Sequence, residues 1–330
     1  MTRQKTYKMV SPLFLALVAC MMTACGGSLP VKMSANTTFD KPDEQLSVNG
    51  RGIDMFTSSK TIMVPGVYVQ TMVRGEQKAS NNGAHSKTSV VVKGITNELG
   101  QTLATALYQD LIKRLRDSGW TVLTYQDIKS DPKVAEDVAD IDHMPFDKDL
   151  GFIGFEKDYT GRGDKTWMMS SPKGIPVFDF DFTGNWPPIS DFEKIGRAIG
   201  ATPVLPRYVF TAPVMYSETG RGYKRSIAKT GLVPAMEMRG GYSYIIYPYG
   251  SIAINHNMRL SENIGTIEKV SASSSENRTL FIGNVFRTMS KGSYVMNLDI
   301  PAYKKAALQA GKDLNKAAVE AINAALPKNK

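Results

Sequence analysis

One leucine-rich stretch in the first half of the chain constrains the fold most. A leucine recurs there at every fourth position, which places these side chains on one face of an α-helix. The leucines are Leu99, Leu103, Leu107, Leu111 and Leu115. Thr96 or Asn97 can cap the start, and Gly119 is placed to end the helix in a left-handed turn. The pattern predicts an amphipathic helix from Thr96 to Ser118 that packs on a core.

Short segments of β character surround this helix. Thr61–Val73, which precedes it, is rich in β-branched residues, and Trp120–Tyr125 follows it directly. We expect a second, small helix within Gln126–Ala139 and a C-terminal helix from about Pro301 to Leu326. A helix that packs beside the strand that follows it is one unit of an α/β layer.

The second half of the chain is rich in β-type segments separated by turn signals. They are Tyr208–Tyr216, Leu232–Met238, Tyr242–Tyr249, Ser251–Leu260, Ile264–Ser273 and Leu280–Met289. Residues 75–89 are polar and predict a loop or a hairpin turn, and residues 140–188 predict an irregular aromatic insertion without a clear period. The fold class is therefore α+β, built on an α/β layer. We expect a mixed sheet with a long helix after the first strands, a C-terminal helix and a β-rich second half.

The first 25 residues have the pattern of an export signal. Arg3, Lys5 and Lys8 precede an apolar run, Met9–Ala24, of about 16 residues. A membrane-spanning helix needs about 20 apolar residues, so this run is short for one. A cysteine follows small residues at two places near its end. The segment resembles a bacterial lipoprotein signal, and this resemblance implies that a cysteine is acylated and becomes the new N-terminus.

Two cysteines compete for this lipid. Leu17 stands three residues before Cys20, as in the usual lipoprotein signal, whereas a cut before Cys25 leaves a flexible Cys-Gly-Gly-Ser start and no free thiol. We expect the lipid at Cys25, with Cys20 as the alternative; a signal without lipid or an uncleaved anchor is a third reading. By analogy with bacterial lipoproteins, Gly26 after the cysteine indicates the outer membrane, on its periplasmic side. The chain then divides into a signal peptide (1–24), a lipidated N-terminus with a tether (25–60) and an α/β domain (61–330).

The charge is positive but thinly spread. Subtracting the three cations of the signal from the net charge of +9 leaves about +6, with no block of Lys or Arg. Nucleic-acid binding requires clustered cations or a basic stripe with interleaved aromatic residues, so we expect no nucleic-acid partner. The balance supports mild attraction to anionic headgroups or polysaccharide.

Few residues point to catalysis. His85, His143 and His256 are isolated in the sequence, and the motifs of zinc sites, phosphate-binding loops and serine hydrolases are missing. Asp179 and Asp181 share one face of a possible strand, which suits acid–base work but is more typical of a solvated face. We therefore expect no catalytic site, no metal and no cofactor.

Four tyrosines in the β-rich half form the one candidate binding surface. Aromatic rings with polar tips can stack on glycans or on a protein partner. These residues are Tyr242, Tyr244, Tyr247 and Tyr249. The alternative is that such a cluster divides between core and surface.

The order of elements resembles the α/β domain of curli-secretion (CsgG-like) lipoproteins, which is similar in turn to the N-terminal domain of TolB. The resemblance rests on Asp117-Ser118-Gly119, where the long helix ends before a strand, and on Gly200-Ala201, where a short helix does the same. It covers about Thr61–Val138 and Ser190–Leu326. The chain departs from the pattern at residues 140–188, and Pro203 and Pro206 interrupt the following strand.

This resemblance implies a non-enzymatic envelope lipoprotein that helps to build or gate an outer-membrane assembly, often as a ring. It transfers no functional residue. We therefore expect a structural or assembly and secretion component that acts through protein–protein contacts, with envelope proteins and further copies of itself as partners. The alternatives are a glycan- or peptidoglycan-binding lipoprotein and a periplasmic hydrolase whose site the sequence does not reveal.

Overall fold

The computed structural model describes residues 46–50, 56, 59–82, 84–143, 152–157, 164–178, 188–222, 225–259, 263–270, 276–282 and 285–324. They belong to one compact unit, Ser34–Lys330. The fold is mixed α/β, which confirms the predicted fold class. Cys20, Cys25, Asp179 and Asp181 lie outside the described residues. None of the described helices combines the length and the apolar composition that crossing a membrane requires.

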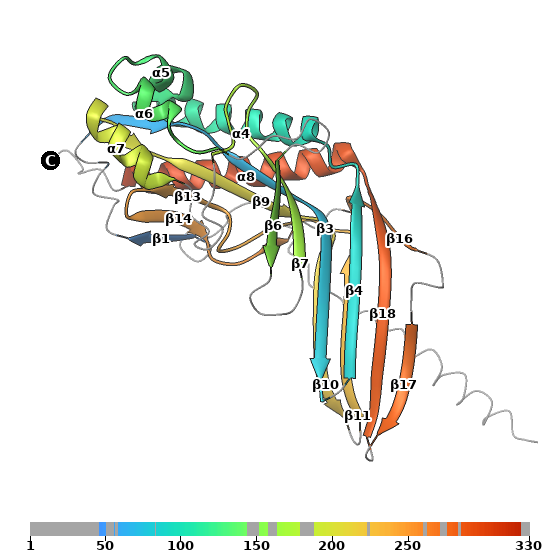
Figure 1. Cartoon of the computed structure of the whole chain (residues 1–330). Coiled ribbons are helices and arrows are strands. Elements are labelled where there is room, and N and C mark those ends of the chain that lie inside the picture. The colour runs from blue at the N-terminus through green and yellow to red at the C-terminus, as the bar shows by residue number, and fades with distance from the viewer. Residues whose placement is uncertain are drawn as a thin grey trace, which may run out of the picture. The chain divides into compact units, whose positions relative to one another are not determined.

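A large mixed sheet forms the centre of the unit (Figure 1). Its path runs through β1 (Leu46–Gly50), β14 (Gly250–Ile254), β13 (Tyr244–Tyr247), β9 (Leu205–Thr211), β3 (Tyr68–Asn81), β4 (Ala84–Lys93), β18 (Val285–Leu298), β11 (Arg225–Val233) and β10 (Val214–Gly222). Six strands pair alongside this path: β6 (Phe152–Lys157), β7 (Asp164–Ser170), β12 (Glu237–Met238), β15 (Met258–Arg259), β16 (Gly265–Lys269) and β17 (Glu276–Ile282). The pairs β3–β9, β4–β18 and β11–β18 are parallel.

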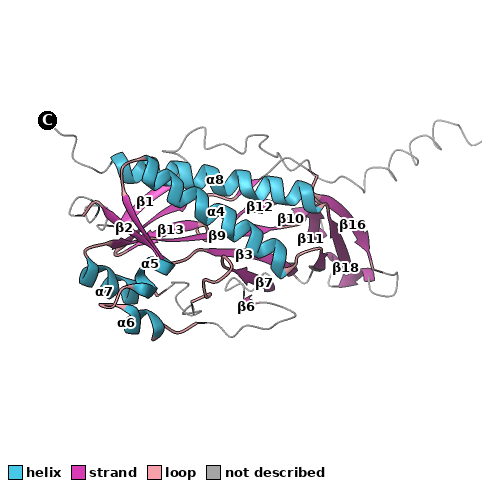
Figure 2. Ribbon diagram, turned by 90° about the horizontal axis from the view of Figure 1, so that it is seen from above, coloured by secondary structure: helices cyan, strands magenta, loops and turns pink. Residues whose placement is uncertain are grey.

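Two long helices pack side by side across the sheet, as Figure 2 shows: α4 (Asn97–Asp117) and α8 (Ile300–Ala324). The leucine stripe of α4 is buried in the main core, and alanines of α8 face it. A buried polar contact joins the layers. The Tyr208 hydroxyl of β9 donates to the Asn315 carbonyl oxygen, and the Asn315 amide donates to the Leu107 backbone oxygen at 3.0 Å.

A smaller sheet of three parallel strands lies at one end. Its order is β5 (Thr121–Thr124), β2 (Thr61–Val64) and β8 (Thr202–Pro203). Three shorter helices pack around it: α5 (Tyr125–Ser130), α6 (Ala135–Ala139) and α7 (Ile189–Ile199). The chain passes directly from β2 into β3, so this small sheet and the large one share a continuous stretch of chain.

Three strand pairs, β3–β4, β10–β11 and β17–β18, project beyond the helices in Figure 1 and are called here the strand extension. The β10–β11 hairpin contacts β3 and β4. The Thr230 hydroxyl oxygen lies 2.8 Å from that of Ser86 and 2.7 Å from that of Thr88. Small apolar residues form a separate cluster between the two hairpins: Ala79, Ala84 and Ala228. Small side chains thus allow two hairpins to pack closely without a large apolar core.

The predicted long helix is confirmed in detail. The Thr96 hydroxyl oxygen accepts a hydrogen bond from the Leu99 amide at 3.2 Å, and Gly119 adopts a φ of +86°. The C-terminal helix and the strand at Thr121–Thr124 are present as well.

Several predicted boundaries were wrong. Thr61–Val73 divides into β2 and β3, because Pro65-Gly66 interrupts it and the two strands join different sheets. Residues 75–89 lie in the β3–β4 hairpin, which confirms the hairpin turn and not the loop, and their buried positions hold small or polar side chains. The stretch 140–188 contains the β6–β7 hairpin, and β7 pairs with β3.

Part of the expected tether also packs on the domain. Residues 46–50 form β1, which pairs with β14. Phe56 is buried, with its ring centroid 6.0 Å from that of Trp120 and 5.2 Å from that of Tyr247.

Candidate functional site

The four tyrosines that the sequence singled out do not form one exposed surface. Tyr244 and Tyr247 are buried in strand β13. The Arg207 guanidinium donates to the Tyr244 hydroxyl at 3.2 Å and to the Gln70 side-chain oxygen at 2.8 and 3.0 Å. Burial raises the pKa of Tyr244, and Arg207 partly offsets this rise. These two tyrosines therefore have structural positions, because each faces the interior of the domain.

The other two tyrosines are more accessible. Tyr242 is half-buried, and the guanidinium of Arg239 lies 4.0 Å from the centre of its ring. Tyr249 is 65% exposed and has a φ of +64°, a left-handed conformation that is rare for a residue with a Cβ. Its hydroxyl donates to Glu193 of α7 at 2.8 Å, and Arg197 donates to the same hydroxyl at 3.2 Å.

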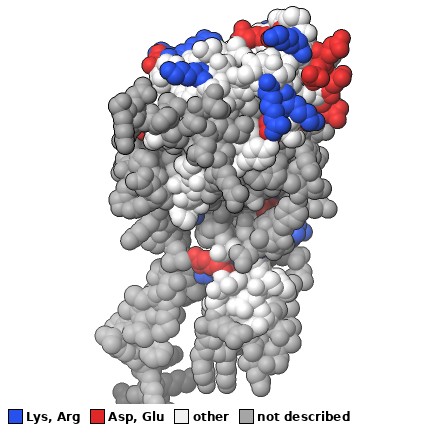
Figure 3. Space-filling model, turned by 90° about the vertical axis from the view of Figure 1, so that its left-hand side faces the viewer, with Lys and Arg blue, Asp and Glu red and all other residues white. Residues whose placement is uncertain are grey.

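Both signs of charge occur around this end of the domain. In Figure 3 acidic and basic side chains gather at the top of the view, the end at which α5, α6 and α7 lie in Figure 1. On α7, Arg197 pairs with Glu193 and Lys194 pairs with Asp191. Tyr249 thus lies exposed beside charged side chains of α7.

The histidines remain apart in the fold. His85 lies on β4 with its Nδ1 3.0 Å from the Ser80 hydroxyl, His143 bridges to Phe178, and His256 is exposed before β15. Within the described ranges, no three His, Cys, Asp or Glu side chains gather in an arrangement that could hold a metal ion.

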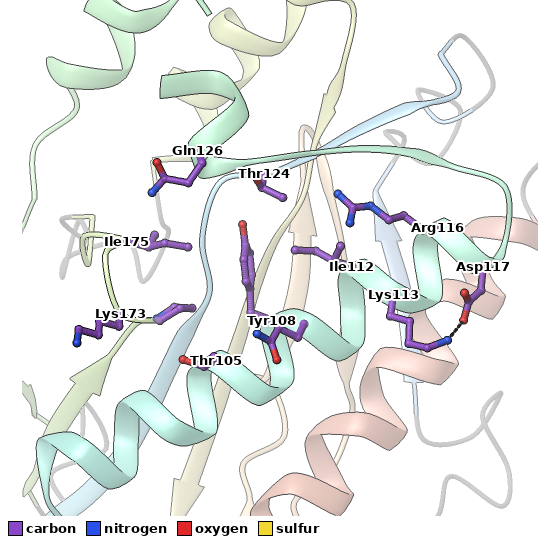
Figure 4. Close-up of a pocket in the computed structure, with 12 residues that line it drawn as sticks. Thr105, Tyr108, Ile112, Lys113, Arg116, Asp117, Thr124, Gln126, Lys173 and Ile175 are labelled. Atoms are coloured by element: carbon purple, nitrogen blue, oxygen red, sulfur yellow. Dashed lines mark hydrogen bonds and ion pairs between the residues drawn. The ribbon is translucent and has the colours of Figure 1, made fainter. Parts of the chain in front are cut away.

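A cavity of about 520 Å³ lies on the outer side of α4, and it is called here the α4 pocket. Three segments line it: α4, the junction of β5 with α5, and the turn at residues 172–175 (Figure 4). Its size is within the range of about 300–1,000 Å³ that is usual for small-molecule sites. Residues of α4 three and four positions apart supply one wall, with Tyr108 and Ile112 buried at its base: Thr105, Tyr108, Gln109, Ile112, Lys113, Arg116 and Asp117.

Tyr108 anchors the floor of the α4 pocket. Its hydroxyl donates to the backbone oxygen of Val64, the last residue of β2, at 2.8 Å, and it accepts from the Tyr125 amide at 3.4 Å. Burial raises the pKa of Tyr108 to about 12, so the phenol stays protonated at neutral pH. The side chain therefore fixes α4 against the carboxyl ends of β2 and β5.

The β5–α5 junction forms the second wall. Thr124 is the last residue of β5, and both its amide and its hydroxyl donate to the Asp127 carboxylate at 2.7 Å. This contact ties the start of α5 to the strand end and leaves Gln126 at the pocket. Parallel strands commonly place ligands just beyond their carboxyl ends, and the α4 pocket occupies this position.

The turn after β7 forms the third wall with Pro172, Lys173 and Ile175. The Ile175 amide donates to the Pro172 backbone oxygen at 3.0 Å, and Gly174 has a φ of +85°. A residue without a Cβ adopts this left-handed conformation easily, so Gly174 allows the tight turn that brings Ile175 over the pocket.

The lining of the α4 pocket holds three cations, Lys113, Arg116 and Lys173, and one carboxylate, Asp117, while the Asp127 carboxylate lies beside it on Thr124. Lys113 forms an ion pair of 2.5 Å with Asp117, which compensates the one carboxylate in the lining. Arg116 donates one hydrogen bond, of 3.3 Å, to the Val122 backbone oxygen. Figure 4 shows the Arg116 guanidinium directed toward Thr124, whereas Lys113 turns to Asp117. Arg116 is therefore the cation directed over the pocket, and Lys173 lies at its rim.

Sequence reasoning did not identify this site. The leucine pattern predicted only the face of α4 that packs on the core, and residues 172–175 fell within the stretch 140–188 that was predicted to be irregular. The available signal was the Thr-Tyr-Gln run directly after a strand that belongs to a parallel sheet, since such positions commonly contact ligands.

Comparison with known proteins adds no relative. No family model, no curated protein and no solved structure matches this chain.

Proposed function

We propose that this chain is a lipid-anchored protein of the outer membrane, on the periplasmic side, which acts without catalysis as a structural or assembly and secretion component of an envelope complex. It works through protein–protein contacts, and we expect its partners to include further copies of itself. The similarity to curli-secretion lipoproteins noted in the sequence is part of this proposal.

The strand extension is the observation that supports this function. Among the described strands, β10 pairs only with β11, and β17 pairs only with β18. A strand with one unpaired edge presents backbone N–H and C=O groups, which readily accept another strand. The nine-residue strand β10 is long enough to add a partner strand by several backbone hydrogen bonds. We propose that these edges form the contacts between copies.

Paired proline variants test this use of the β10 edge. Successive residues of a strand direct their N–H groups to opposite edges, so either Glu218→Pro or Thr219→Pro removes an N–H that faces away from β11. We expect that variant to keep its fold, measured by circular dichroism, and to lose the oligomer, measured by native mass spectrometry of the detergent-extracted protein. The other variant removes a β10–β11 hydrogen bond and should lower stability. A wild-type protein that is monomeric at every concentration, or a folded variant pair with unchanged assembly, would contradict the proposal.

The exposed ring of Tyr249 favours a second candidate, binding of glycan or peptidoglycan. Exposed aromatic rings stack on sugars, and Glu193 and Arg197 beside the ring offer hydrogen bonds to hydroxyl groups. Tyr249→Ala should then reduce sedimentation with isolated cell wall, whereas Tyr249→Phe, which keeps the ring, should retain most of it. Equal sedimentation of wild type and both variants would remove this candidate.

A further inference from the structure

We infer that the α4 pocket is a binding site for a small organic anion, one with an apolar ring-sized body and a single acidic group such as a carboxylate, sulfonate or phosphate. This inference does not depend on the proposed assembly function. It rests on the walls of the pocket, on its polar groups without partners and on its charge.

The walls come from three separate parts of the chain and are held in place by hydrogen bonds. Tyr108 is bonded to the end of β2, Thr124 is bonded to Asp127, and the 172–175 turn is closed by its own backbone bond. A cavity with walls fixed in this way needs little ordering when a ligand enters, and this lowers the entropic cost of binding.

The lining combines apolar surface with polar groups that have no protein partner. Ile112, Pro172 and Ile175 provide apolar contacts for the body of a ligand. Thr105, Gln109, Gln126 and Lys173 also line the pocket. Thr105 is half-buried and the other three are exposed, and within the part of the chain that the structure describes these four side chains form no hydrogen bond or ion pair, so they are free to contact a ligand. An apolar cavity with a few convergent polar groups is the usual composition of a small-molecule site.

The charge selects an anion. Asp117 is compensated by Lys113, while Arg116 extends over the cavity toward Thr124. Arg116 uses one of its five N–H groups to donate to the Val122 backbone oxygen. The remaining N–H groups of its guanidinium can still bind an acidic group. Lys173 lies on the opposite wall, where it is exposed and its side chain extends outward in Figure 4, so its positive charge is at the rim of the pocket. This charge favours an anionic ligand over a cationic or neutral one.

Isothermal titration calorimetry on the full-length, detergent-extracted protein, with a micelle blank, tests the inference through three probes. Naphthalene-2-sulfonate carries both the ring body and the charge, naphthalene-2-methanol carries the body alone, and inorganic sulfate carries the charge alone. We expect the sulfonate to bind at least about tenfold more tightly than either other probe, because only the sulfonate uses both parts of the pocket. Equal binding of sulfonate and alcohol, tighter binding of sulfate, or no binding of sulfonate at millimolar concentration would each overturn the inference.

Two charge variants locate the bound probe. Arg116→Gln and Lys173→Gln should each weaken naphthalene-2-sulfonate, Arg116→Gln by at least about fivefold, which is the upper range for an exposed ion pair. Lys133→Gln removes the same charge from an exposed position between α5 and α6 and should change the affinity by less than about twofold. The melting temperature of each variant checks its fold, and Lys173, on a turn, provides the test if Arg116→Gln unfolds. Equal effects of all three variants, or of none, would show that the anion binds elsewhere.

Discussion

Removing the side chain of Leu107 tests how α4 is held in the domain. The side chain of Leu107, a residue of α4, is completely buried where α4 packs on α8. A Cβ built on Gly311 of α8 would lie 2.5 Å from one methyl carbon of Leu107 and 2.7 Å from the other. Asn315 also bonds to the backbone oxygen of Leu107, which restrains the distance between the two helices. Leu107→Ala should therefore leave a cavity that the helices cannot close.

We expect Leu107→Ala to lower the free energy of unfolding by about 3 to 5 kcal/mol, the upper part of the range for buried leucines. Gly311→Ala alone brings a methyl group into Leu107, and this overpacking costs about 1 to 3 kcal/mol, offset by about 1 kcal/mol of helix propensity. In the Leu107→Ala background the same methyl group fills the cavity, so Gly311→Ala should then stabilise the protein. The double-mutant cycle should show a coupling energy of about 1 to 3 kcal/mol.

Guanidinium denaturation of the full-length protein, followed by tryptophan fluorescence and circular dichroism, measures these differences. Val91→Ala, at an exposed position of β4, is the control and should change the free energy of unfolding by less than about 0.5 kcal/mol. A cost for Leu107→Ala below about 0.5 kcal/mol would refute the packing described here. Additive effects of the two substitutions would refute the contact between Leu107 and Gly311.

Two further predictions concern pH and the membrane. Because folding raises the pKa of Tyr108 from 10.0 to about 12, its protonated form stabilises the native state; this contribution is complete below pH 10 and is lost as the pH rises toward 12. The stabilisation of wild type relative to Tyr108→Phe, measured as the difference in unfolding free energy, should therefore be constant below pH 10 and fall between pH 10 and pH 12. A difference that stays constant up to pH 12 would show that the phenol is not buried. Cys25→Ser should move the protein from the membrane to the soluble fraction on cell fractionation, whereas release by Cys20→Ser and not by Cys25→Ser would assign the lipid to Cys20.

Local patterns in the sequence were sufficient to predict the two long helices. The leucine stripe, the Thr96 cap and Gly119 all act within a few residues, and together they specify α4 without reference to the rest of the chain. The strand Thr121–Thr124 follows for the same reason. Periodicity is a property of neighbouring residues, so it can be recognised in a single sequence.

Contacts between segments that are distant in the sequence could be identified only from the tertiary structure. Tyr244 and Tyr249 look alike in the sequence, yet one is buried beside Arg207 and Gln70 while the other is exposed beside Glu193. The polar residues 75–89 left a loop or a hairpin turn open, because the hairpin on which they pack, β10–β11, lies well over a hundred residues further along the chain.

The α4 pocket likewise combines a part that the sequence predicted with a part that only the tertiary structure revealed. The sequence alone predicted the helix that forms its floor, but the cavity exists only because the 172–175 turn and the end of β5 reach the same side of α4. Sequence spacing specifies which face of a helix is apolar, whereas the packing of strands and turns from elsewhere in the chain specifies what the opposite face meets.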